Sequence, residues 1–501
     1  MKMFLITAAL ALALVSCSSS VKAAPGGGEL RFGVISDIHI GGSGHGTDVY
    51  PNEQRLEKAL DWYNTQDGVK AVALVGDITD RATQEQWDTF KKSWDEHKGG
   101  LRLIAAMGNH DAYSEEQSAA LFESATGQKA NAHYVIEGYH FIVITGGEGA
   151  FTNLGAKGGA IAGGETVKTG SHGGSDVIPK SVKDWLRGRI NDAKKAAPGQ
   201  PVFVFVHWPV QNTFYVSDEW YTSNFGDDPL SGFFKDDHEV VVFSGHIHSP
   251  NNDPRSIWQG GFTSVNTATL YYFDMEKAGY QGAKYLGNGN PYNTPNPNPD
   301  SEGIVGSTYP KQAAESICGD AAAQGLLVTV NGSRVTIENY DFAVSRGPEG
   351  AVEKIPQTWI FDVSKSAEFP YTAAKREAQK TAPVFDAGAA ASGPVYGKIR
   401  VKEQTETTVT VEFDQAVIPA PNPGGEAVHS YRFDFINKES GQIEVTRYQW
   451  SDFMVTPSLQ KPVYEQRIGG LSAGAEYELR IYAYSSFQAE SGQYLLSELS
   501  F

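Results

Sequence analysis

The segment Phe32-Gly-Val-Ile-Ser-Asp37-Ile-His39 places an Asp-x-His pair directly behind a short apolar run. Runs rich in Val and Ile are typical of buried parallel strands. Four further polar motifs follow along the chain, and each comes after an apolar run of its own. They are Gly76-Asp77-Ile-Thr-Asp80, Gly108-Asn109-His110-Asp111, His207 and Gly245-His246-Ile-His248.

The apolar runs place these motifs at the carboxyl ends of predicted strands. The runs cover residues 32–35, 71–75, 101–107, 202–206 and 240–243. In open α/β sheets the carboxyl ends of the strands border the crevice where ligands bind. We therefore expect the five motifs to face one another in one binding site.

The motifs offer seven candidate metal ligands, all with nitrogen or oxygen donor atoms. Imidazole, carboxylate and amide ligands suit divalent ions such as Zn, Mn or Fe. Seven ligands are too many for one tetrahedral ion, but two ions about 3.5–4 Å apart can share them if one carboxylate bridges. We assign the bridge to Asp77. The candidate ligands are Asp37, His39, Asp77, Asn109, His207, His246 and His248.

The order of the five motifs resembles that of the calcineurin-like metallophosphoesterase superfamily over residues 30–365. The resemblance implies that one metal ion is held by Asp37, His39, Asp77 and His248. It implies that the second is held by Asp77, Asn109, His207 and His246. The purple acid phosphatase branch carries Tyr where Asp80 stands here, so the chain is more similar to the branch that includes class III cyclic-nucleotide phosphodiesterases.

The resemblance implies hydrolysis of phosphodiesters or phosphomonoesters by a metal-bridging hydroxide, with His110 contacting the substrate. Two divalent ions neutralise phosphoryl oxygens and lower the pKa of bound water, to near ~7 in favourable zinc sites. We expect His110 to donate the proton that the leaving alkoxide needs. Asp111 either holds that imidazole protonated or forms the turn. Asp80 is either a helix cap or an outer partner of the site.

The histidines outside the motifs are interpreted as surface or core residues, with one exception. His45 stands in the glycine-rich loop 41–46, directly after the first candidate ligands. Loops beside a site often contact ligands, so His45 is a candidate for substrate binding, with a surface role as the alternative. Two longer loops, 146–174 and 282–309, either shape the mouth of the site or are disordered.

Three amphipathic segments predict helices that cover the sheet. The stripe formed by Trp87, Phe90 and Trp94 favours core packing over a ligand platform, because its spacing is helical. Strands that alternate with such helices indicate the α/β class. The resemblance adds a layered metallophosphoesterase β-sandwich flanked by helices. The other two stripes are Leu56, Ala59, Leu60 and Tyr63, and Val182, Trp185, Leu186 and Ile190.

The pattern changes after residue 365. Residues 366–394 carry Ala, Lys and Pro and predict a linker, and residues 395–501 alternate β-rich runs with turns, which predicts an all-β sandwich. The segment 471–484 resembles the closing strands of a fibronectin type III domain. We expect this sandwich to be a separable spacer or docking module, with ligand binding as the alternative. The expected strands are 398–401, 408–413, 431–436, 464–468 and 477–484.

The amino terminus predicts export and lipid anchoring. Lys2 precedes the apolar run 4–15, which is shorter than the about 20 residues of a membrane-spanning helix. Leu14-Val15-Ser16-Cys17 resembles a bacterial lipobox, so residues 1–16 form a predicted signal peptide and residues 17–29 a tether. We expect lipidation of Cys17 and a place in the cell envelope, facing the periplasm or the exterior. An ordinary signal peptide cleaved near Ala24 is the alternative.

The formal net charge is −18, from 59 acidic and 41 basic residues. Such a balance opposes non-specific binding of nucleic acid, which depends on Lys and Arg. Once Cys17 is lipidated, Cys318 is the one remaining cysteine, and a single thiol cannot form an intramolecular disulfide. A nuclease on the same scaffold and a non-enzymatic phosphate-binding or adhesive module are the alternative functions. Neither the substrate nor the oligomeric state follows from the sequence.

Overall fold

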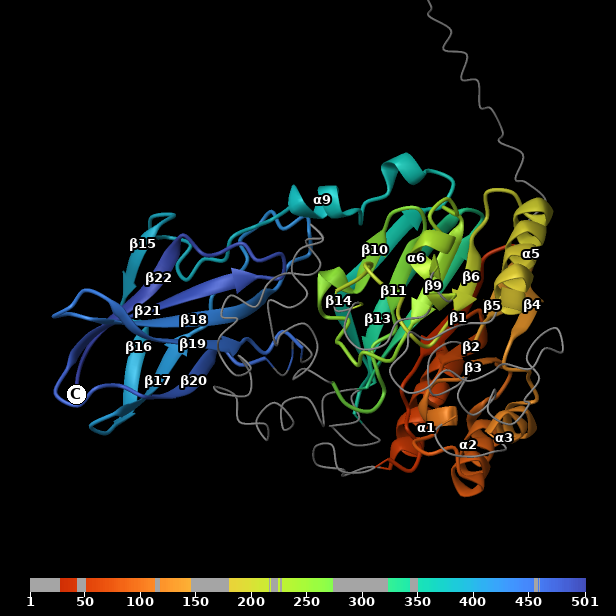
Figure 1. Cartoon of the computed structure of the whole chain (residues 1–501), viewed down its shortest axis with the longest axis horizontal. Helices are drawn as coiled ribbons and strands as arrows, with labels where there is room; N and C mark the ends of the chain where they lie inside the picture. Colours follow the sequence, from red (N-terminus) through yellow and green to blue (C-terminus); the bar gives the residue numbers. More distant parts are fainter. Residues whose placement is uncertain are drawn as a thin grey trace, which may run out of the picture.

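The computed structural model describes residues 28–42, 51–112, 118–145, 180–215, 217, 224–225, 228–273, 323–342, 350–454, 458 and 460–501. Cys17, His45, Cys318 and the two long loops 146–174 and 282–309 lie outside these ranges. Within them the chain forms a layered α/β part and a separate all-β part, which Figure 1 shows side by side. The predicted fold class is confirmed.

The first sheet has six strands in the order β14-β13-β12-β1-β2-β3. Strands β1, β2 and β3 are parallel, whereas β12 pairs antiparallel with β1. The motif-bearing loops after β1, β2 and β3 therefore leave the sheet at the same edge. The strands are β1 Leu30–Ile35, β2 Val69–Val75, β3 Arg102–Ala106, β12 Gln324–Asn331, β13 Arg334–Asp341 and β14 Glu353–Asp362.

The second sheet also has six strands, in the order β10-β11-β9-β6-β5-β4. Strands β5, β6, β9 and β11 are parallel, so the loops after β6 and β9 also emerge together. The five apolar runs are thus divided between two sheets, in agreement with the β-sandwich that the family resemblance implies. The strands are β4 Ala132–Ile136, β5 Tyr139–Val143, β6 Val202–Phe205, β9 Val240–Ser244, β10 Ile257–Gln259 and β11 Thr263–Asn266.

The main core lies between these two sheets. Phe32 in β1 packs edge-on against Phe141 and Phe203 of the second sheet, with ring centroids 5.0 and 4.9 Å apart. All three rings are fully buried, as is Phe243 in β9. Since aromatic side chains bury large apolar areas, this cluster fixes the sheets against each other.

Helices cover the outer faces, as the amphipathic stripes predict. Leu56, Trp87 and Phe90 pack in one cluster with residues of the first sheet, and Leu186 and Ile190 pack with the second. The tryptophan stripe is therefore core and not a ligand platform. The main helices are α1 Asn52–Thr65, α2 Gln84–His97, α3 Ser118–Thr126 and α5 Lys180–Ala196. Short elements are η1 His110–Ala112, β7 Asn224–Phe225, β8 Asp228–Pro229, α6 Leu230–Phe233 and η2 Pro254–Ser256.

The C-terminal part consists of two packed sheets, of strand order β15-β22-β21-β18-β19 and β16-β17-β20. Side chains of both sheets, including Phe413, Tyr431 and Tyr464, share one core. Strands β15, β19 and β22 were not predicted from the sequence, because polar residues interrupt their apolar pattern. The strands are β15 Gly393–Tyr396, β16 Ile399–Gln404, β17 Thr408–Asp414, β18 Val428–Asn437, β19 Ile443–Trp450, β20 Val463–Gly469, β21 Glu476–Ser485 and β22 Gln493–Ser500.

The predicted linker is folded. It contains η5 Ser366–Glu368 and α9 Ala373–Glu377, which bridges the two parts at the top of Figure 1. Arg376 in α9 is only 3% exposed. Among the described residues, no helix is both long and apolar enough to cross a membrane.

Candidate metal centre

The candidate ligands lie on five loops that follow β1, β2, β3, β6 and β9 and converge from both sheets. Asp37 and His39 come after β1, Asp77 after β2 and His207 after β6, while His246 and His248 follow β9. Backbone hydrogen bonds join neighbouring loops: Asp37 N donates to Gly76 O over 3.1 Å, and Gly245 N donates to His207 O over 3.0 Å. The convergence predicted from the apolar runs thus spans two sheets.

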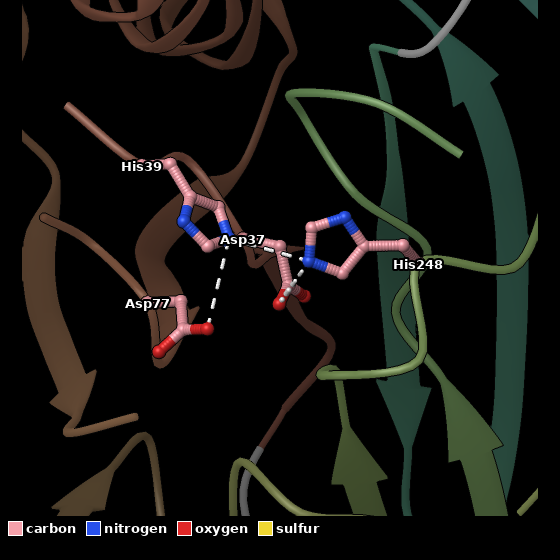
Figure 2. A group of neighbouring side chains, drawn as sticks. All are labelled: Asp37, His39, Asp77 and His248. Atoms are coloured by element: carbon pink, nitrogen blue, oxygen red, sulfur yellow. Dashed lines mark hydrogen bonds and ion pairs between the residues drawn. The ribbon is translucent and has the colours of Figure 1, made fainter. Parts of the chain in front are cut away.

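One group of side chains brings together Asp37, His39, Asp77 and His248, with ligand atoms that all lie within 4.8 Å of one another. His248 Nε2 is 3.1 Å from Asp37 Oδ1, and His39 Nε2 is 3.6 Å from Asp77 Oδ2. Figure 2 shows that these side chains point toward a common centre, with His248 arriving from the opposite sheet. All four residues are buried. Their donor set suits a divalent cation.

A second group brings together Asp77, His207 and His246. His207 Nε2 lies 3.2 Å from the same Asp77 Oδ2 that faces His39. Asn109 Oδ1 is buried, and among the described residues no donor hydrogen-bonds to it. A buried acceptor without a donor is costly unless a cation satisfies it. The residues therefore fit two metal ions, and Asp77 is the member that both groups share.

Five of the candidate ligands hold a left-handed backbone. The φ angles of Asp37, His39, Asp77, His246 and His248 are 52°, 52°, 49°, 72° and 48°. Such angles are uncommon for residues with a side chain, and where they persist the surrounding structure holds them. The strained backbone at these five positions indicates that the surrounding structure fixes the directions of the candidate ligand side chains, which an ordinary surface turn does not require.

Two motif glycines make room for the carboxylates. A Cβ atom on Gly108 would lie 2.1 Å from Asp77 Oδ1, and one on Gly245 would lie 2.4 Å from Asp37 Oδ2. Both distances are far below van der Waals contact, so any larger residue would displace a candidate ligand. Packing therefore explains why glycine stands at the first position of the Gly-Asn-His and Gly-His-x-His motifs.

Backbone carbonyls orient two of the imidazoles. His207 Nδ1 lies 2.8 Å from Val75 O, and His248 Nδ1 lies 2.9 Å from Tyr272 O. A carbonyl only accepts, so each Nδ1 carries the hydrogen and donates it. The Nε2 atoms are thereby turned toward the carboxylates, which is how outer partners usually orient metal-binding histidines.

The electrostatics of the centre favour positive charge. Burial alone would raise the pKa of Asp77, but His207 and His110 hold it well below its usual value. Burial likewise opposes ionisation of Asp37, and His248 keeps that pKa lowered. Burial lowers the pKa of His207, yet Asp77 and Asp37 outweigh it and raise the value to about 9. The field that holds a proton on His207 also attracts a cation, and cation binding would release that proton.

Asp80 pairs with histidines and does not cap the helix. Its Oδ1 lies 3.4 Å from His39 Nδ1 and 3.6 Å from His110 Nδ1, while its carbonyl accepts from His110 Nδ1 over 2.8 Å. The cap of α2 is Thr83, whose side chain accepts from Gln86 N. Of the two roles that the sequence leaves open, the structure therefore favours the outer partner of the site.

Of the two roles that the sequence leaves open for Asp111, the structure favours the turn. Its buried carboxylate accepts from the backbone N–H groups of Gly108, Ile78 and Thr79, at 2.8–3.1 Å, and from the Thr79 hydroxyl. Burial and the nearby Asp77 raise the pKa of Asp111 to about 6. Asp111 therefore ties the loop after β3 to the loop after β2, and Asp80 is the carboxylate beside His110.

Aromatic residues beside the centre were missed by the sequence analysis. The Trp208 ring centroid lies 5.2 Å from His207 and 5.4 Å from His246, and Tyr272 lies 4.3 Å from His248. Trp208 directly follows a candidate ligand, which was an available signal. Tyr272 belongs to no motif. The lipidation site Cys17 and the substrate candidate His45 lie outside the described residues.

Residues 30–250 match the family model for calcineurin-like phosphoesterases. This part of the chain is therefore a calcineurin-like phosphoesterase domain. The class that such a domain defines is that of metal-dependent phosphoester hydrolases, and the groups of Asp and His side chains could hold two divalent ions. A comparison with curated proteins finds no match.

Solved structures with similar folds include a purple acid phosphatase from yellow lupin seeds, with 9% identity and a TM-score of 0.37. The match covers 67% of this chain but 54% of the lupin enzyme, so the chain spans about half the length of that protein. PhoD matches with 10% identity and a TM-score of 0.38 over 68% of this chain and 71% of its own. The FN5 domain of Drosophila Lar matches with 11% identity and a TM-score of 0.14, over 22% of this chain and 95% of its own. At such TM-scores these likenesses carry no further argument.

Proposed function

We propose that this chain is a binuclear metallophosphoesterase that cleaves phosphodiesters or phosphomonoesters. The observation that carries the proposal is the position of Asp77, which belongs to both groups of candidate ligands. Asp37, His39 and His248 complete one metal site, and Asn109, His207 and His246 complete the other. When bound, the two ions supply Lewis acidity toward phosphoryl oxygens and a hydroxide nucleophile near neutral pH.

The remaining residues of the centre orient the reacting groups and move one proton. His110 lies against His39, with ring centroids 4.5 Å apart, and its side chain is about a quarter exposed, so it faces both the ligands and solvent. Asp80 O accepts from His110 Nδ1. That bond fixes the orientation of the ring, and we expect Nε2 to donate the proton to the leaving alkoxide.

The two alternative functions are weaker. A nuclease on the same scaffold must hold a polyanion, and the net charge of −18 opposes that. A purely phosphate-binding or adhesive module needs neither a shared carboxylate nor five strained ligand positions. These observations favour turnover of a phosphoester over both alternatives.

Removal and return of metal tests this function. We expect the purified protein to hydrolyse bis-nitrophenyl phosphate or nitrophenyl phosphate, to lose that activity after chelation and to regain it with Mn or Zn. Elemental analysis should find about two ions per active chain. Comparison of the two nitrophenyl esters separates diesterase from monoesterase. Metal-loaded protein that cleaves neither ester, while still binding phosphate, would support the binding module instead.

We propose further that Cys17 anchors the protein to a membrane of the cell envelope, with the enzyme facing the periplasm or the exterior. The support is the lipobox-like Leu14-Val15-Ser16-Cys17 and the polar tether that follows. Several acyl chains on one residue give stable anchoring, whereas a single chain gives marginal binding.

Fractionation of bacteria tests the anchor. Wild-type protein should sediment with membranes, and Cys17→Ser should not, because a serine cannot receive the thioether-linked lipid. Cys318→Ser is the matched control and should sediment like the wild type. Wild-type protein recovered wholly in the soluble periplasmic fraction would refute the anchor.

A further inference from the structure

The loop that follows His248 is buried between the two parts of the protein. Ser249, Asn251, Asn252 and Asp253 are each at most 5% exposed. On the side of the α/β part, Gln324 in β12 accepts from Asn251 N over 2.9 Å, and Asn266 in β11 donates to Ser249 O over 2.9 Å. The other side of this loop faces the C-terminal sandwich.

Two side chains join this loop to the sandwich, each by bridging a pair of backbone carbonyls. Gln357 Nε2, in β14, donates to Asn252 O over 3.1 Å and to Gly425 O over 2.9 Å. Arg376, in α9, donates from Nη2 to Pro254 O over 3.0 Å and from Nη1 to Gly424 O over 2.8 Å. We call Gln357 and Arg376 the carbonyl clamp.

Packing holds the arginine of the carbonyl clamp in place. The Arg376 guanidinium lies over the Tyr371 ring at 4.6 Å and over Phe487, a sandwich residue, at 5.4 Å. A buried guanidinium needs partners for its N–H groups, and the two carbonyls provide them for Nη1 and Nη2 from opposite sides. The contact of Arg376 with the loop and the sandwich therefore has a defined hydrogen-bonding geometry within a buried interface.

A second contact reaches the segment that follows His207. Arg255 is fully buried, pairs with Asp253 at 2.6 Å and lies 3.5 Å over the Tyr215 ring. Tyr215 N donates to Arg255 O over 3.0 Å. The Tyr215 ring faces His429 of the sandwich, with centroids 6.2 Å apart, and His429 stacks on Phe453 at 5.0 Å.

We propose that the C-terminal sandwich is a positioning part of the metal centre, and that Gln357 and Arg376 are the positioning residues that transmit its effect. This inference rests on the proposed metal site. His246 and His248 hold left-handed backbones, which persist only where surrounding contacts fix them. The carbonyl clamp fixes the loop four to six residues beyond His248. The sandwich therefore acts as more than the separable spacer that the sequence suggests.

The sharpest test is Gln357→Glu in the full-length protein. The new side chain has nearly the same shape, but a carboxylate cannot donate to the two carbonyls and is repelled by both. We expect the affinity for Mn, titrated into chelated protein, to fall by up to about 10-fold, which is the lower end of the loss seen when a direct partner of a metal ligand is removed, because Gln357 acts on His248 through the intervening loop. The kcat for a nitrophenyl ester should fall with it, while KM changes little.

The matched control is Gln404→Glu, which makes the same change on the exposed strand β16, where Gln404 bonds only within the sandwich, to Ser500 O. It should leave both the Mn affinity and kcat unchanged. Arg376→Lys is a second test, because lysine keeps the charge but cannot reach both carbonyls in the fork geometry of arginine. It should weaken Mn binding even if Gln357→Glu fails to fold.

Mn affinity measured well below the unfolding temperature separates positioning from mere stability, because a purely structural contact would lower Tm alone. Wild-type Mn affinity and kcat in the folded Arg376→Lys or Gln357→Glu protein would overturn the inference. The titration needs no turnover. A wild-type protein that binds two Mn ions yet cleaves no phosphoester would defeat the proposed function and leave this test intact.

Discussion

Asp77→Asn should abolish hydrolysis and lower the metal content from about two ions per chain to about one or none. Asp77 Oδ2 lies 3.2 Å from His207 Nε2 and 3.6 Å from His39 Nε2, so this one oxygen faces both groups of ligands. An amide keeps the shape but removes the negative charge that two cations would share. Loss of a two-metal clamp costs several kcal/mol of transition-state stabilisation, which is roughly a 10³-fold loss of rate or more.

A buried aspartate elsewhere provides the control for Asp77→Asn. Asp237 is 5% exposed and pairs with Arg187 at 2.7 Å and with Lys194 at 3.3 Å, far along the chain from the motifs. Asp237→Asn should lower Tm but leave metal content and activity per folded chain unchanged. Metal analysis and turnover of the two variants are the measurements. Retention of two ions and near-normal turnover in Asp77→Asn would rule out the bridging role.

The strands and the loops that follow them were predictable because buried strands require apolar residues, which can be seen directly in the sequence. Strands β1, β2, β6 and β9 are buried on both faces, so they appear as unbroken apolar runs. The polar motifs at their ends then mark the site. The family resemblance implied a sandwich of two sheets, but the apolar runs alone did not show which strand belongs to which sheet, because an apolar run does not indicate the strand with which it pairs.

The roles of the two acidic motif residues could not be read from spacing. Asp111 directly follows His110, whereas Asp80 ends a different motif, and only the backbone of the two loops decides which carboxylate points toward His110. In the structure Asp111 faces the amides of Ile78 and Thr79, and Asp80 faces His110. Side-chain direction depends on local backbone angles, which spacing along the chain does not give.

The contact between the sandwich and the metal loops left no sequence signal. Gln357 and Arg376 stand alone in a strand and a short helix, and their partners are backbone carbonyls, which any residue supplies. A linker was the natural prediction for 366–394 because the segment carries Ala, Lys and Pro and precedes the β-rich part. Arg376 is nevertheless buried, since Nη1 and Nη2 find acceptors on opposite sides. Tertiary contacts that use backbone atoms are invisible to motif analysis.

His110→Ala should keep both metal ions and lower kcat by an amount that depends on the leaving group. The backbone N–H of His110 donates to Asp77 Oδ1 over 2.9 Å, and alanine retains that donor, so the bridging carboxylate stays in place. Only the imidazole is lost. General acid catalysis typically contributes about 10²–10⁴-fold, so an alkyl phosphoester should suffer a loss in that range. A nitrophenyl ester should lose far less, since nitrophenolate leaves without a proton.

The ratio of the two losses is the decisive measurement, because it separates proton donation from electrostatic stabilisation of the phosphoryl group. His97→Ala serves as the control: His97 is a partly exposed histidine that pairs with Asp61 at 2.8 Å, away from the metal groups, and its removal should change neither rate. Metal content is measured on each variant. Equal losses for alkyl and nitrophenyl substrates, with both ions retained, would show that His110 acts on charge alone and that the proton comes from water.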